Sequence, residues 1–145
     1  MGLKMSSSIA IASGKGGVGK TTIAVNLSLT LCQMGSKVSL MDADFGLANA
    51  HILLGINPKR TIRDLLKNEL PLEDIIETGP SGLKFISGGN GLIDILNIEK
   101  NSKYQLIRAL DPIQKNTDYL LVDIPAGASD NSMTFASAVD KLIIV

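Results

Sequence analysis

The chain has 145 residues, 45% hydrophobic and 19% charged, a mixture that indicates a globular domain with its own core rather than a disordered chain. Lys and Arg together number 14, as do Asp and Glu, so a net charge of zero gives no global attraction to nucleic acid or to an anionic membrane. The single cysteine, Cys32, excludes an internal disulfide and a multi-cysteine metal site in these residues and fits a reducing cytoplasm. No secretion signal is expected at the start, and we predict one partial domain over residues 1–145.

Short apolar runs predict five β-strands, at residues 8–13, 37–42, 83–87, 119–123 and 141–145. Between the first two, a helical stripe of Ile23, Leu27 and Leu31 predicts a helix that Gly35 ends. Most of the strands are apolar along their whole length, as in parallel sheets covered on both faces.

Further helices are predicted between the later strands. Thr61 opens a short helix, and Pro71 opens the next. Ser102 is the expected cap of a helix whose inward side chains are Leu106, Ile107, Leu110 and Ile113. Asp130 is the expected cap of a helix that holds Met133, Phe135, Ala136 and Val139. Strands alternating with helices predict an α/β fold with a doubly wound, mostly parallel sheet.

Residues 13–22, SGKGGVGKTT, follow the first expected strand and carry four glycines and two lysines. Residues 14–21 match the P-loop pattern G-x-x-x-x-G-K-[ST], in which glycines let backbone N–H groups converge on a phosphate. In this pattern Lys20 reaches the β- and γ-phosphates and the Thr21 hydroxyl ligates Mg²⁺. The predicted nucleotide-binding residues are Gly14, Lys15, Gly16, Gly17, Val18, Gly19, Lys20, Thr21 and Thr22.

Three aspartates are predicted at the same edge of the sheet as this loop. Asp42 and Asp44 come at the end of the second expected strand, and Asp123 ends the fourth. Ligands of doubly wound sheets bind beyond the carboxyl ends of the strands. An acidic residue placed like Asp123 is typical of the Walker-B aspartate that holds Mg²⁺.

The run KGGVGKTT resembles the deviant Walker A loop of the MinD/ParA group of ATPases. The resemblance implies the P-loop NTPase fold of that group, with ATP and Mg²⁺ as cofactors. It also implies that Lys15 reaches the phosphates of a partner subunit, whereas Lys20 acts within its own subunit. A cation supplied by the partner stabilises the transferring phosphoryl group only after two subunits close, which would couple dimerisation to hydrolysis.

The stretch DADFGLANAHILLG, from Asp42 onward, resembles the switch I region of this group and is most similar to its flagellar branch, FlhG/FleN. There the first acid holds a Mg²⁺-bound water and the second positions the attacking water. The resemblance therefore implies Thr21, Asp42 and Asp123 as metal residues and Asp44, with Lys15 and Lys20, as catalytic residues. LEDIIETGPSGLKFISGGNG and DYLLVDIPAG also resemble that branch and place Asp123 and Gly127 in switch II.

The resemblance implies a dimerising ATPase switch that controls where a cell structure is built, with flagella as the first expectation. Expected partners are a second copy of the chain in the presence of ATP and a signal-recognition-type GTPase. The chain stops inside the apolar run KLIIV, so we expect the front part of a longer protein, truncated after the fifth strand. Only seven residues precede the first strand, so the glutamine-rich helix of flagellar members is not expected here. Association with the cytoplasmic face of a membrane would come from the family's C-terminal part, and no nucleic-acid partner is predicted.

Four alternatives remain open at the level of sequence. A chromosome or plasmid partitioning ATPase would need nonspecific DNA binding, and a septum-site MinD would share the same loop. An iron–sulfur carrier would need cluster-binding cysteines, which the single Cys32 argues against. A small-molecule ligase or kinase would need a substrate pocket beside the phosphates. His51, the only histidine, is expected to have a surface or packing role.

Overall fold

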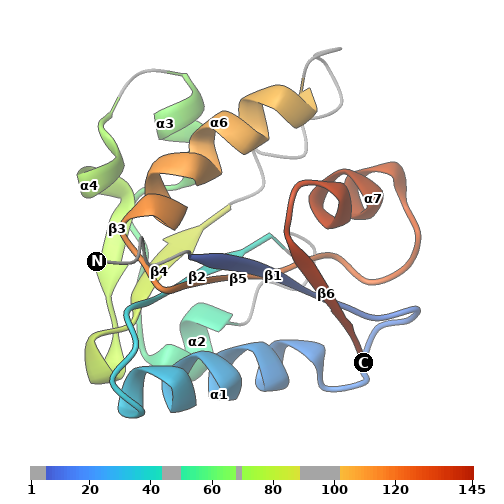
Figure 1. Cartoon of the computed structure of the whole chain (residues 1–145), viewed down its shortest axis with the longest axis horizontal. Helices are drawn as coiled ribbons and strands as arrows, with labels where there is room; N and C mark the ends of the chain where they lie inside the picture. The colour runs from blue at the N-terminus through green and yellow to red at the C-terminus, as the bar shows by residue number, and fades with distance from the viewer. Residues whose placement is uncertain (1–5, 44–49, 68–69, 89–101) are drawn as a thin grey trace, which may run out of the picture.

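The computed structural model describes residues 6–43, 50–67, 70–88 and 102–145. Within these ranges the strands are β1 (Ser7–Ala12), β2 (Val38–Asp42), β3 (Ile76–Thr78), β4 (Lys84–Ser87), β5 (Tyr119–Asp123) and β6 (Lys141–Ile144). They form one sheet in the order β3-β4-β2-β5-β1-β6 (Figure 1). All pairings are parallel except that of β3 with β4.

Helices cover both faces of this sheet. They are α1 (Lys20–Gln33), α2 (Ala50–Leu54), α3 (Ile62–Leu66), α4 (Leu72–Ile75), the 3-10 helix η1 (Pro80–Gly82), α6 (Ser102–Lys115) and α7 (Asp130–Ser137). In Figure 1, α1 and α2 lie on one face, and α3, α4, α6 and α7 lie on the other. The doubly wound α/β fold predicted from the sequence is therefore confirmed. No described helix is long and apolar enough to cross a membrane.

Neighbouring residues of each central strand enter different apolar layers. The layer beneath α1 and α2 is built from Ile11, Ala24, Val25, Val38, Leu40, Ala50, Leu54, Leu83, Phe85 and Leu121. The opposite layer is built from Ala10, Met41, Ala43, Ile62, Ile75, Ile86, Leu110, Ile113, Leu120, Val122, Ile124 and Phe135. Leu40 and Met41, adjacent in β2, thus face opposite ways. Burial on both faces explains why β2 and β5 read as continuous apolar runs, whereas β6 at the edge of the sheet is exposed.

All five predicted strands are present, with ends that differ from the predicted ones by at most one residue. The structure adds β3, which the sequence analysis missed. This strand has three residues, Ile-Glu-Thr, and lies antiparallel at the edge of the sheet, directly after α4. A short edge strand contributes no apolar run, so the pattern used for the buried strands could not reveal it.

The predicted apolar stripe of α1 is only partly correct. Ile23 is 40% exposed, whereas Leu27 and Leu31 are half-buried against the core. The side of α1 that packs most closely on the sheet carries small residues, including Ala24 and Ser28. The Ser28 hydroxyl donates to the Ala24 carbonyl at 2.7 Å, which satisfies a polar group in the interior. Small side chains let α1 approach the sheet closely. Side-chain size therefore determines which residues of α1 face the sheet more than hydrophobicity does.

Three predicted helix boundaries are confirmed. Gly35 follows α1 with φ +94 and donates its backbone N–H to the Cys32 carbonyl at 3.0 Å. Thr61 caps α3, and its backbone N–H donates in return to the Asp64 carboxylate at 2.9 Å, so the two form a capping box. Pro71 is the residue that precedes α4.

The start of α6 differs slightly from the prediction. Ser102 is the first residue of the helix rather than the residue before it. Leu110 and Ile113 are buried, as predicted. The side chains of Leu106 and Ile107 lie outside the described part of the structure.

The predicted cap of α7 is wrong by one position. Ser129 precedes the helix, and its hydroxyl accepts a hydrogen bond from the Ser132 backbone N–H at 3.2 Å, whereas Asp130 is the first helical residue. Both residue types favour helix caps, so pattern alone could not choose between neighbours. Phe135 is fully buried, Met133 is 59% exposed, and the helix ends before Val139.

We expect Ser129→Ala to lower the free energy of unfolding by about 1 kcal/mol, because the variant loses the cap of α7. Asp130→Ala should cost only about 0.5 kcal/mol, the effect of a single charge near the helix N-terminus. Urea unfolding followed by circular dichroism measures both. A larger loss for Asp130→Ala than for Ser129→Ala would contradict the assigned cap.

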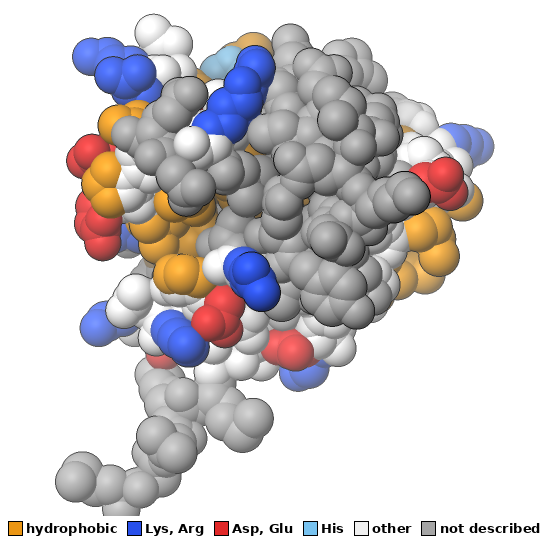
Figure 2. All heavy atoms as spheres, turned by 90° about the horizontal axis from the view of Figure 1, so that it is seen from above, with side chains coloured by type: hydrophobic (Ala, Val, Ile, Leu, Met, Phe, Trp, Pro, Cys, Tyr) orange, Lys and Arg blue, Asp and Glu red, His pale blue; other side chains and the backbone are white. Residues whose placement is uncertain are grey.

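The face of the molecule above α3, α6 and α7 carries charges of both signs. Figure 2 shows Lys and Arg side chains beside Asp and Glu side chains on the described part of this face. On α6, Lys115 and Asp111 form an exposed ion pair at 2.9 Å. Such a mixture matches the zero net charge of the whole chain.

Candidate functional site

A glycine-rich loop connects β1 to α1 and is anchored at its base. Residues 14–19 are exposed, whereas Ser13 before them and Lys20 after them are buried. The Ser13 hydroxyl donates to the Lys15 carbonyl at 2.9 Å, and the Ser13 carbonyl accepts from the Gly127 N–H at 2.8 Å. These two contacts tie the loop to itself and to the segment that follows β5.

The backbone of this loop requires glycine at two positions and leaves open space above it. Gly17 and Gly19 have φ of +73 and +88, where a side chain would be strained. A Cβ built at Gly14, Gly16, Gly17 or Gly19 would meet no atom within 4 Å. Gly19 precedes α1 and, having no side chain, makes no capping hydrogen bond to the first amides of the helix. Exposed amides at the positive end of a helix form a cradle suited to an anion such as phosphate.

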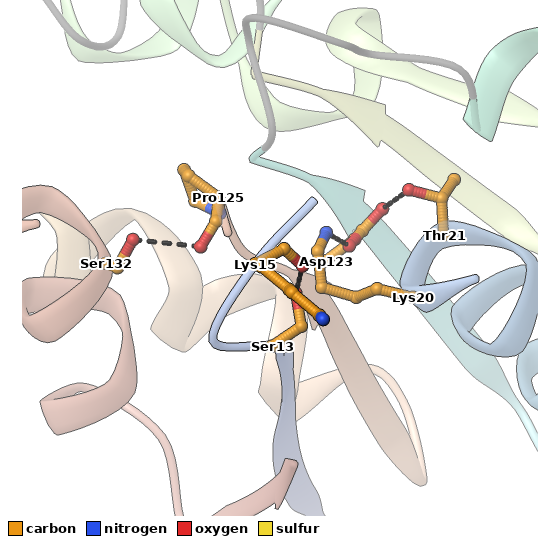
Figure 3. Close-up of polar contacts among 7 residues, drawn as sticks. All are labelled: Ser13, Lys15, Lys20, Thr21, Asp123, Pro125 and Ser132. Atoms are coloured by element: carbon orange, nitrogen blue, oxygen red, sulfur yellow. Dashed lines mark hydrogen bonds and ion pairs between the residues drawn. The ribbon is translucent and has the colours of Figure 1, made fainter. Parts of the chain in front are cut away.

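Lys20, Thr21 and Asp123 meet beneath the loop (Figure 3). Lys20 and Thr21 begin α1, and Asp123 ends β5. The Lys20 ammonium forms a buried ion pair with Asp123 Oδ1, and the Thr21 hydroxyl donates to Asp123 Oδ2 at 2.7 Å. The structure thus brings together three residues that the sequence analysis placed in one site.

Asp42 lies beside this cluster. It ends β2 and pairs in register with Asp123 on the neighbouring strand, and both carboxylates are buried. Thr21, Asp42 and Asp123 are hard oxygen donors, the kind that Mg²⁺ prefers together with phosphate oxygens and water. The residues present therefore fit Mg²⁺ beside a phosphate group in the loop. Asp44, the expected water-positioning residue, lies outside the described residues.

The other predicted loop residues are at the surface. Lys15, Val18 and Thr22 are exposed, and Lys15 forms no ion pair with any described residue. The Lys15 side chain is therefore accessible to a ligand or to another molecule, unlike the buried Lys20.

The sequence analysis missed part of the segment that follows β5. Ser132, on α7, is buried and donates its hydroxyl to the Pro125 carbonyl at 2.9 Å (Figure 3). Together with the contact from Gly127 to Ser13, this bond fixes the turn next to Asp123. The spacing of Ser129 and Ser132, a cap three residues before a small polar residue, was the available signal in the sequence.

Cys32 and His51 do not belong to this site. Burial raises the pKa of the Cys32 thiol, and the residue packs against the core beneath α1. His51 is half-buried on the short helix α2. Among the described residues, no group of three His, Cys, Asp or Glu side chains could hold a metal ion by itself. A bound cation would therefore need further ligands, such as the Thr21 hydroxyl and phosphate oxygens.

A cavity of about 160 Å³ lies away from this cluster, where β2 and β4 begin. Its lining is Ser39, Leu72, Glu73, Ile76, Lys84, Pro112, Ile113, Asn116 and Thr117. Since the glycine loop and the aspartates lie where the strands end, this cavity is not part of the candidate site.

Comparisons with known proteins agree with this geometry. A family model described as "ParA: NUBPL iron-transfer P-loop NTPase" matches residues 4–145. The antiactivator FleN of Pseudomonas aeruginosa is 39% identical over 137 residues, which are 94% of this chain and 49% of FleN. The flagellum site-determining protein YlxH of Helicobacter pylori is 36% identical over 137 residues, covering 94% of this chain and 47% of YlxH.

Comparison with solved structures also gives a match to a MinD protein. The septum site-determining protein MinD of Pyrococcus horikoshii, in complex with Mg-ADP, superposes with a TM-score of 0.82 at 30% identity. The match covers 97% of this chain and 58% of that one. The chain spans about half the length of the curated relatives it matches.

Proposed function

Because the chain belongs to the ParA/MinD family of P-loop NTPases, we propose that it binds Mg-ATP and hydrolyses it as a molecular switch. The observation that carries this proposal is the cluster of Lys20, Thr21 and Asp123 beneath an exposed, open glycine loop. The loop offers amides to phosphate, and the cluster offers a cation and hard oxygen ligands. The Mg-ADP complex of the related MinD supports ATP and Mg²⁺ as the cofactors.

The proposed roles rest on position for the described residues and on the family resemblance for Asp44 and for the inter-subunit role of Lys15. The loop amides and the start of α1 bind the phosphates, and Lys20 offsets the charge of the β- and γ-phosphates. Thr21, Asp42 and Asp123 would hold Mg²⁺, which when bound offsets the negative charge on the phosphoryl oxygens. Asp44 orients the attacking water, and Lys15 supplies its charge to a partner subunit.

For the cellular role, we propose control of the placement or number of a structure, with flagella as the first candidate. YlxH supports this choice, because its name describes a flagellum site-determining protein. FleN, an antiactivator, supports a regulatory role. MinD, a septum site-determining protein, supports the broader role of spatial placement. The partners in this proposal are a second copy of the chain and a signal-recognition-type GTPase, in the cytoplasm or on its membrane face.

Iron transfer, which the description of the family model names, is a weaker candidate for this chain. Iron–sulfur clusters are held mainly by several Cys thiolates. Cys32 is the only cysteine of the 145 residues, and burial raises its pKa above the ordinary value of a thiol. A partitioning role or a small-molecule ligase activity has no specific observation in its favour.

The switch is tested with Asp44→Ala. We expect this variant to bind Mg-ATP and to form dimers as the unmodified protein does, but to hydrolyse ATP about 10²-fold more slowly, because a water-positioning residue acts on the chemical step. Phosphate release under single-turnover conditions gives the rate, and sedimentation gives the association state.

Two outcomes would contradict the assignment. Turnover near the unmodified level in Asp44→Ala, together with an inactive Asp42→Ala, would show that the roles of the two acids are reversed. Failure of the unmodified protein to bind Mg-ATP by calorimetry would overturn the proposed function itself.

A further inference from the structure

Asp123 contacts both residues that the loop would present to a phosphate and its Mg²⁺. One carboxylate oxygen pairs with the Lys20 ammonium, and the other accepts from the Thr21 hydroxyl. We propose that Asp123 is an internal competitor for these groups, which makes the site reject nucleotide that arrives without Mg²⁺. This inference rests on the proposed function and deepens it, because it concerns which form of the nucleotide is accepted.

The buried position of the pair makes the competition strong. The Lys20 side chain is 6% exposed and that of Asp123 is 0% exposed, so solvent and salt screen their attraction weakly. A phosphate that recruits Lys20 takes the ammonium away from Asp123. It also places a second negative group beside a carboxylate that is shielded from water. Separating a buried pair in this way is unfavourable.

Asp123 has little freedom to move out of the way. It ends β5, which lies between β2 and β1 in the sheet, and its carbonyl accepts from the Ala43 N–H at 2.9 Å. In register it pairs with Asp42 on one side and Ile11 on the other. An incoming anion therefore approaches a carboxylate that stays beside Lys20 and Thr21.

A nucleotide that binds together with Mg²⁺ changes the balance of charge around Asp123. Asp123 can then exchange one cation for another, so Lys20 becomes available to the phosphates while the buried carboxylate stays compensated. A carboxylate that served only as a metal ligand would strengthen Mg-nucleotide binding and leave Mg-free binding unchanged. The internal competitor also weakens Mg-free binding, so the effect of the carboxylate on Mg-free affinity separates the two roles.

The experiment compares ADP binding in EDTA and in Mg²⁺ by calorimetry. We expect Asp123→Asn to bind ADP in EDTA about 10-fold more tightly than the unmodified protein, and to gain little affinity when Mg²⁺ is added. Asp130→Asn is the matched control, because it removes the same charge from an exposed position at the start of α7. This control should keep the Mg²⁺ preference of the unmodified protein.

A second variant with a second readout distinguishes a change in anion binding from a folding defect. Asp123→Ser removes the carboxylate with a smaller side chain, and its thermal midpoint is followed while inorganic pyrophosphate is added in EDTA. A larger rise than in the unmodified protein supports the inference.

An equal or smaller rise, or ADP affinity in EDTA that Asp123→Asn does not improve, overturns the inference while the proposed function stands. If the unmodified protein does not bind Mg-ADP at all, the proposed function fails, and the inference fails with it.

Discussion

Lys20→Ala is expected to abolish Mg-ATP binding, with a loss of affinity of about 10³-fold or more. Lys20 is the buried cation beneath the glycine loop, and a loss of about 10³-fold is about 4 kcal/mol, in the upper part of the range of about 2–5 kcal/mol that removing one partner of a desolvated, charge-paired contact costs. The loop amides remain in the variant, but they carry only partial charges. Calorimetry in the presence of Mg²⁺ measures the change.

The control for Lys20→Ala has to separate lost binding from lost folding. The variant leaves Asp123 buried without the Lys20 ammonium, so its thermal midpoint is measured in parallel, together with that of Lys20→Met, which keeps most of the side-chain volume. Lys115→Ala removes an exposed lysine of α6 and should bind Mg-ATP normally. Unchanged ATP affinity in a folded Lys20 variant would overturn the P-loop assignment.

Much of the site could be predicted because its residues are close in sequence or follow strands. Lys20 and Thr21 belong to a contiguous pattern whose glycines have a direct physical purpose. Asp42 and Asp123 end apolar runs that are buried on both faces, and parallel strands bring such ends to one edge of the sheet. The contiguous loop motif and the position of each aspartate after an apolar run were sufficient to predict these residues.

The contacts that the sequence did not reveal depend on tertiary packing. Lys20 and Asp123 are 103 positions apart, and their ion pair follows from the order β2-β5-β1 at the centre of the sheet. The close packing of Ala24 follows from the short approach of α1 to the sheet, which favours small residues over large apolar ones such as Ile23. The spacing of apolar residues in the sequence determines neither the order of the strands nor the distance between α1 and the sheet.

Burial also separates the two lysines of the loop, of which the P-loop pattern specifies only Lys20. Lys20 is enclosed and paired with Asp123, whereas Lys15 is exposed and forms no ion pair with any described residue. This difference supports the proposal that Lys20 acts on a ligand of its own subunit. Lys15, exposed in the same loop, is accessible to another molecule.

Lys15→Ala is therefore expected to leave nucleotide binding by the single chain within about threefold of the unmodified protein, because the loop amides and Lys20 remain. It should remove ATP-dependent dimerisation and, with it, hydrolysis. The physical reason is that a lysine from the partner stabilises phosphate charge only when two subunits close.

The two lysine variants are compared in the Asp44→Ala background, where hydrolysis is blocked and ATP stays bound. Lys20→Ala should lose nucleotide affinity, whereas Lys15→Ala should keep it and sediment as a monomer in ATP. Lys115 is an exposed lysine of α6, far from the loop in the sequence. The variant Lys115→Ala should therefore dimerise as the background protein does. If Lys15→Ala still forms dimers with ATP, the inter-subunit role is wrong. The protein would then be an ordinary P-loop enzyme whose loop carries an additional surface lysine.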